Sequence, residues 1–209
     1  MIAPEQAIRR WRRIGLQLVV ATMVYNMAEA VIALGSGVAA ESIALVGFGL
    51  DSIIETIAAG VLLWRLRLET QGADHARIET AEQRVHRFVG GTFIALALYI
   101  LGQSGWILWQ QEAPHESLPG IILAIASLVI MPSVAVGKLH AARIIASGAL
   151  RAEARETLAC SYLSCTLLLG LVANAAVGWW WADPVAALLM VPWLVKEGME
   201  GLRAEVCCH

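Results

Sequence analysis

Charged residues are scarce in this sequence. They make up 15% of its 209 residues, whereas a typical soluble domain carries about 25%. Hydrophobic residues make up 58% and the mean hydropathy is +0.67. The composition therefore argues against a soluble chain and favours a membrane protein. Four cysteines are too few and too scattered for the disulfide framework of a small secreted domain, so we expect free thiols.

Catalytic motifs are also missing. The chain has neither a G-x-S-x-G nucleophile motif nor an H-E-x-x-H zinc motif. An intramembrane enzyme would be expected to show paired aspartates or a histidine-rich cluster, and neither is present. We therefore expect a protein that is not an enzyme, that binds no nucleic acid and that holds no permanent cofactor.

Six apolar segments are present, and each is long enough to cross a bilayer, which takes roughly 20 mostly apolar residues. They cover residues 14–34, 39–64, 88–110, 118–137, 156–178 and 184–202. The sequence thus predicts an all-α integral membrane bundle of six transmembrane helices, forming a single domain over residues 1–209.

Lysine and arginine are absent from three of the loops between these segments. The loops GSGVAAES, QQEAPHES and GWWWADP contain none, and all 15 basic residues of the chain lie on the other side of a six-span arrangement. By the positive-inside rule, both termini are expected in the cytoplasm and the protein in the cell (inner) membrane. The basic connector 138–155 could be helical throughout, and Asp183 reads as the N-cap of the last span, before Pro184.

Two acidic residues interrupt the second apolar segment. Asp51 and Glu55 are four residues apart, so a helix places them on one face near the middle of the span. A charge at that depth costs about 2.5–3.5 kcal/mol even on the lenient insertion scale. Metal or proton binding would explain the pair. The alternative is neutralisation by protonation or by an arginine, although no basic residue lies at matching depth in another span.

The fifth segment offers further ligands. Glu153, Glu156, Cys160 and Ser164 recur at three- and four-residue steps and so share a helix face. Carboxylates together with a thiolate suit Zn²⁺ and similar borderline ions. We therefore predict a metal site formed by Asp51, Glu55, Glu156 and Cys160. The competing interpretation puts Glu156 at the membrane surface beside Arg155 or Arg151, with Cys160 as a small apolar residue.

Two further features remain open. Glu29, with Asn26 one turn before it, could form an outer gate or a second cation site, or be a helix-end carboxylate bonded to a neighbouring backbone group. The ending Cys207-Cys208-His209 could pass on soft metals or be a chance pairing.

Residues 35–64 resemble the first two spans of the cation diffusion facilitator family, six-span exporters of Zn²⁺ and related ions that commonly exchange metal for protons. Asp51-Ser-Ile-Ile-Glu55 matches the family's [His/Asp]-x-x-x-Asp motif on span 2, with Glu for the final Asp. Trp181-Ala-Asp183-Pro184 resembles the start of its span 6. The partner motif on span 5 would fall near Glu156-x-x-x-Cys160, where the usual His and Asp are missing. The resemblance implies a short form without the histidine-rich loop and the C-terminal cytoplasmic domain.

The function expected from these observations is export of Zn²⁺ or another divalent cation from the cytoplasm by proton antiport. The partners expected are the cation, protons and the lipid bilayer, with a homodimer as an open option. The alternative is a membrane metal sensor or accessory subunit that keeps a degenerate site and does not transport.

Overall fold

The described residues form a bundle of six helices. The computed structural model describes residues 5–70, 75–111 and 115–203, and the side chains of this part except residues 65–86 and 149. The helices are α1 Glu5–Ala40, α2 Ile43–Thr70, α3 His75–Gln110, α4 Leu118–Ile144, α5 Gly148–Val177 and α6 Ala182–Arg203. The described residues contain no strand, and the predicted all-α class is confirmed. The predictions for Cys207, Cys208 and His209 concern residues outside the described part.

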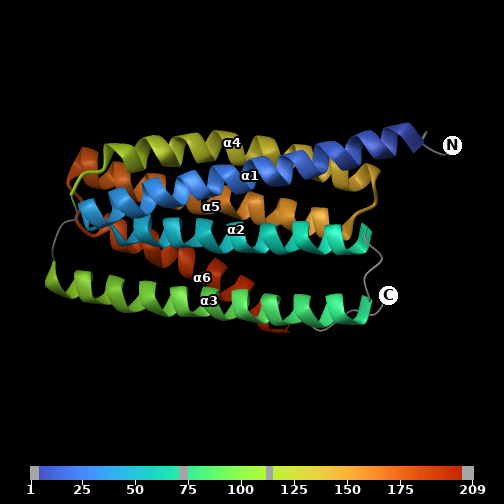
Figure 1. The fold of residues 1–209 in the computed structure, drawn as a ribbon. Helices are drawn as coiled ribbons and strands as arrows, with labels where there is room; N and C mark the ends of the chain where they lie inside the picture. Colours follow the sequence, from blue (N-terminus) through green and yellow to red (C-terminus); the bar gives the residue numbers. More distant parts are fainter. Residues whose placement is uncertain (1–4, 71–74, 112–114, 204–209) are drawn as a thin grey trace.

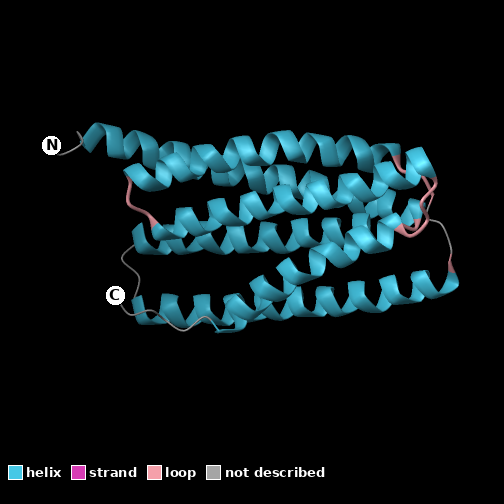
Figure 2. Cartoon of the chain, turned by 180° about the vertical axis from the view of Figure 1, so that it is seen from behind, coloured by secondary structure: helices cyan, strands magenta, loops and turns pink. Residues whose placement is uncertain are grey.

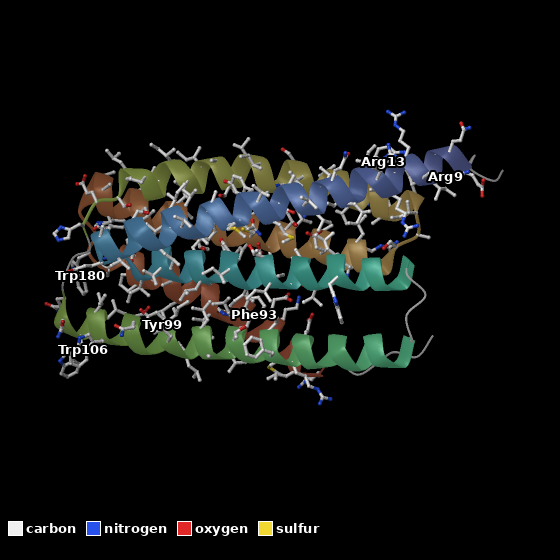
Figure 3. The ribbon with its side chains drawn as sticks, in the orientation of Figure 1. Arg9, Arg13, Phe93, Tyr99, Trp106 and Trp180 are labelled. Carbon is white, nitrogen blue, oxygen red and sulfur yellow. The ribbon has the colours of Figure 1, made fainter. Side chains whose placement is uncertain are left out.

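Successive helices run in opposite directions along the bundle, so the two ends of the chain lie at the same end (Figure 1). The side chains of Arg9 and Arg13 lie at that end, and Trp106 and Trp180 lie at the opposite end (Figure 3). This arrangement has the form expected for a chain that crosses a bilayer six times. Its sidedness stays a prediction from the positions of the basic residues.

The helices pack chiefly as three pairs, α1 with α2, α4 with α5, and α3 with α6. α1 also packs against α4, and α2 packs against α3, α5 and α6. Seen from behind, the described loops lie at the two ends of the bundle (Figure 2). α2 therefore lies where its polar residues can meet side chains from several neighbours.

The outer surface of the bundle is apolar. Val24, Val31 and Val38 recur every seven residues on α1 and are between 66% and 71% exposed. Residues 122, 129 and 136 form an equivalent apolar stripe on α4. Within the part of the chain that the structure describes, five helices are long and apolar enough to cross a membrane. α6, which carries Lys196, Glu197 and Glu200, is not among them. Apolar stripes of this length are what lipid tails would cover.

Several helices extend beyond the apolar segments. α1 continues to Ala40, and its turn into α2 takes only Glu41, whose φ is 55°, and Ser42. The connector 138–155 is not one helix, because α4 ends at Ile144 and Ser147 caps α5 by accepting a hydrogen bond of 3.3 Å from the Leu150 N–H. The prediction of a continuous helix there is wrong, since the cap and the turn at 145–147 separate the two helices.

Asp183 does not cap its own helix. α6 already begins at Ala182, and the Asp183 carboxylate points to the start of α2 instead. It accepts hydrogen bonds from the Ser42 hydroxyl, from the Ile43 N–H at 2.9 Å and from the Ala44 N–H at 3.4 Å. The predicted N-cap is corrected in one respect: the carboxylate caps a helix end, but that of α2.

Candidate functional site

The antiparallel packing of α1 against α2 sets the register of the site. The Asn26 side-chain N–H donates to the Glu55 carboxylate at 2.9 Å. One turn further along α1, Glu29 accepts a hydrogen bond of 2.8 Å from the Ser52 hydroxyl. A residue four positions before Glu55 lies one helical turn away on the same face. Ser52 and Glu55 of α2 thus contact Glu29 and Asn26 of α1, and Asp51 lies one turn from Glu55.

Glu29 lies at the meeting point of four helices. Its side chain is 1% exposed. Besides Ser52 of α2, the Ser127 hydroxyl of α4 donates to it, and the Cys160 sulfur of α5 lies 3.9 Å from Oε2. The Tyr25 hydroxyl in turn lies 2.8 Å from the Ser127 oxygen.

These contacts decide between the interpretations of Glu29. It lies in the middle of α1 and accepts from side-chain hydroxyls, so it is not a helix-end carboxylate bonded to a neighbouring backbone group. The structure places it beside the predicted site rather than at the outer end of the span.

Asp51 is the buried acidic residue of α2. Its side chain is 3% exposed, so it does not face lipid. One of its oxygens, Oδ2, is buried and has no hydrogen-bond partner within the described residues. Glu55 is partly buried and lies one helical turn from Asp51 on the same face of α2. In the part of the chain that the structure describes, neither α2 carboxylate forms an ion pair.

The two α5 residues of the predicted site lie in different surroundings. Cys160 is fully buried, and its sulfur contacts Glu29, the α1 carboxylate that also binds Ser52 of α2. Glu156 is only partly buried and lines a cavity of about 660 Å³ between α5 and α6, together with Arg155, Tyr162, Lys196, Glu197 and Glu200. The structure thus places Cys160 beside Glu29 and places Glu156 on the cavity between α5 and α6.

Lys138 is a buried cation that sequence reasoning missed. Its side chain is 0% exposed, and its ammonium group donates to Glu153 at 2.6 Å, to Thr22 at 2.7 Å and to Thr157 at 2.9 Å. All three donors of the ammonium group are therefore used. The sequence prediction ended the fourth span at residue 137, whereas α4 continues to Ile144 and carries Lys138 into the bundle.

This pair also corrects the interpretation of α5. Glu153 shares a helix face with Cys160, as predicted, but one of its oxygens is committed to Lys138. The signal available in the sequence was the absence of any turn residue between Gly137 and Ser147, which favours helix past residue 137.

Among the described residues, no three Asp, Glu, His or Cys side chains converge closely enough to hold a metal ion. A cation bound to Asp51 and Glu55 would therefore need further ligands. They would come from residues of other types, or from α5 side chains after that helix moves closer. Oxygen atoms of amides and hydroxyls are available nearby, on Asn26, Ser52 and Ser127.

The fold and the site together define a multi-pass helical membrane protein with carboxylates buried between its helices. The chain belongs to the cation efflux family, because the model of the cation efflux transmembrane domain matches residues 19–206. It is also similar to an uncharacterized transporter of the cyanobacterium Synechocystis sp., with 27% identity over 158 residues. That match covers 74% of this chain and 51% of the relative, so the chain spans about half the length of the curated relative it matches.

Proposed function

We propose that this protein exports a divalent metal cation, Zn²⁺ or a similar ion, from the cytoplasm in exchange for protons. The observation that carries the proposal is a buried oxygen of Asp51 that has no partner within the described residues, one helical turn from Glu55. An ionised carboxylate inside an apolar bundle is costly, and a visiting cation would offset that cost. Membership of the cation efflux family supports the same activity.

The proposed site is centred on Asp51 and Glu55, with Cys160 and Glu156 as the contributions of α5. Carboxylate and thiolate groups hold a metal only after they lose their protons, so protons and metal compete for the same groups. Opening the site first to one side of the membrane and then to the other would couple metal export to proton entry. In this proposal both termini lie on the cytoplasmic side of the cell membrane.

A flux measurement tests the proposal. The full chain is reconstituted in vesicles that contain a metal-sensitive dye, and Zn²⁺ uptake is followed under an imposed proton gradient. We expect Asp51→Asn to abolish uptake, because the substitution keeps the shape of the side chain but removes its charge. The matched control is Glu5→Gln, an exposed carboxylate at the start of α1 that should leave uptake unchanged.

Two results would overturn the proposal. Unchanged uptake by Asp51→Asn would remove the α2 pair from the transport site. Saturable Zn²⁺ binding by the wild-type protein with no flux at any proton gradient would instead favour the non-transporting sensor or accessory subunit.

A further inference from the structure

We propose that α1 supplies a ligand to the transported cation, the side-chain amide oxygen of Asn26, alongside the carboxylates of Asp51 and Glu55. The inference rests on the proposed function. It adds a third helix to a site that sequence reasoning had assigned to α2 and α5 alone.

The first support is that only one of the two polar atoms of the Asn26 amide has a hydrogen-bond partner among the described residues. Asn26 is 5% exposed, and its N–H donates to Glu55 at 2.9 Å. Its other polar atom, Oδ1, is buried and has no hydrogen-bond partner within the described residues. Most buried polar atoms in proteins are paired, so an unpaired amide oxygen calls for a physical reason.

The second support is that Asp51, like Asn26, has a buried oxygen without a hydrogen-bond partner among the described residues. That oxygen is Oδ2. Asp51 lies one turn from Glu55, the residue that Asn26 contacts. When Asp51 is ionised, these two oxygens cannot satisfy each other, because both are then acceptors only. A cation between them would satisfy both and would also balance the charge of the α2 carboxylates.

Glu29 provides the contrast within the same helix. It is equally buried and lies three residues further along α1, yet both of its oxygens accept hydrogen bonds from serine hydroxyls. Its lone pairs are therefore largely used, whereas those of Asn26 Oδ1 are free. The structure thus favours Asn26 over the more obvious carboxylate as the ligand from α1.

The chemistry of the amide oxygen predicts which metal ions depend most on Asn26. Amide and carboxylate oxygens suit hard cations such as Mn²⁺, whereas a thiolate such as that of Cys160 suits soft cations such as Cd²⁺. Loss of the Asn26 oxygen should therefore weaken Mn²⁺ binding more than Cd²⁺ binding. Loss of the Cys160 sulfur should do the reverse.

Calorimetric titration of the detergent-purified full chain with MnCl₂ and with CdCl₂ tests this inference. We expect Asn26→Ala to weaken Mn²⁺ binding by about tenfold or more, as removal of groups that hold or orient a bound metal typically does. Cd²⁺ binding should change much less. Cys160→Ser should show the opposite selectivity. The control is Ser104→Ala, which removes a buried hydroxyl of α3 that also lacks a partner within the described residues.

A second variant separates coordination from support of Glu55. Asn26→Asp keeps an oxygen at the position but loses the N–H that holds Glu55. If Asn26 is a ligand, Asn26→Asp should retain Mn²⁺ binding. If Asn26 only positions Glu55, Asn26→Asp should lose binding as fully as Asn26→Ala, which would overturn the inference.

The remaining outcomes are also decisive. Equal losses for Mn²⁺ and Cd²⁺ in Asn26→Ala, or no loss for either, would overturn the role of Asn26. The proposed function would stay intact, provided that Asp51→Asn weakens the binding of both ions. If the wild-type protein binds neither ion, the proposed function fails, and this inference fails with it.

Discussion

Lys138 and Glu153 form a buried ion pair across the turn that joins α4 to α5, with 2.6 Å between the ammonium nitrogen and Oε1. Thr22 of α1 and Thr157 of α5 complete the hydrogen bonds of the ammonium group. The pair therefore ties three helices together without involving the α2 carboxylates. The pair joins α4 to α5, the helix that carries Cys160.

The first prediction concerns the stability that this pair provides. Lys138→Met should destabilise the fold by about 3–5 kcal/mol, because it leaves the Glu153 charge buried and unpaired. Thermal unfolding in detergent, followed by tryptophan fluorescence, measures the effect. Replacing both partners, as in Lys138→Met with Glu153→Met, should recover much of the loss, since well-packed apolar residues can substitute for a buried pair.

The matched control is the pair formed by Lys196 and Glu200 on α6. Its atoms are 3.8 Å apart and its side chains are more than half exposed. Lys196→Met should change stability by less than about 1 kcal/mol, as is usual for surface pairs. Equal effects of Lys138→Met and Lys196→Met would show that burial does not strengthen the inner pair.

The helices and the position of the α2 acidic pair could be predicted because hydropathy and helical periodicity are local properties. Asp51 and Glu55 needed only their spacing and the apolar residues around them. The partners of these residues could not be predicted in the same way, because the contacts of Glu55 with Asn26 and of Glu29 with Ser127 depend on how the helices pack.

The ends of the helices were the second feature that could not be predicted correctly from the sequence. An apolar segment marks the stretch that lipid can cover, but the helix itself continues until a cap or a turn stops it. The prediction therefore ended the fourth span before Lys138 and lost a buried ion pair. Asp183 was identified as a capping residue from its neighbour Pro184, but only the packing of α6 against α2 shows which helix it caps.

The second prediction follows from that cap. Asp183→Ala should destabilise the protein by about 1–3 kcal/mol, because the N–H groups of Ile43 and Ala44 and the hydroxyl of Ser42 lose a buried acceptor. Asp183→Asn should lose less, since it keeps one acceptor oxygen. The measurement is thermal unfolding in the same detergent. A wild-type melting temperature for Asp183→Ala would show that water replaces the carboxylate there.

The third prediction uses two neighbouring glycines of α3. A Cβ on Gly90 would lie 2.8 Å from the Gly198 carbonyl oxygen of α6, whereas a Cβ on Gly91 would have nothing within 4 Å. Close approach of small residues is typical of helix pairs in membranes. Gly90→Ala should therefore destabilise the protein by about 1–3 kcal/mol through overpacking.

Gly91→Ala is the internal control for that prediction. It should leave stability unchanged or raise it by up to about 1 kcal/mol, because alanine favours helix over glycine. The two variants differ by one position and carry the same change, so their difference in thermal unfolding reports the α3–α6 contact alone. A loss of stability in both would point instead to a general intolerance of α3 to added volume.

The fourth prediction concerns pH. Protons compete with a metal for Asp51 and Glu55, so metal affinity should fall as pH is lowered, by about tenfold per unit for each proton displaced. Calorimetric titration with Zn²⁺ at a series of pH values measures this slope. Asp51→Asn removes one competing group and should therefore both weaken binding and flatten the slope. Glu5→Gln, far more exposed and at the start of α1, should keep the wild-type slope. A slope for Asp51→Asn as steep as that of the wild-type protein would show that the displaced protons come from other residues.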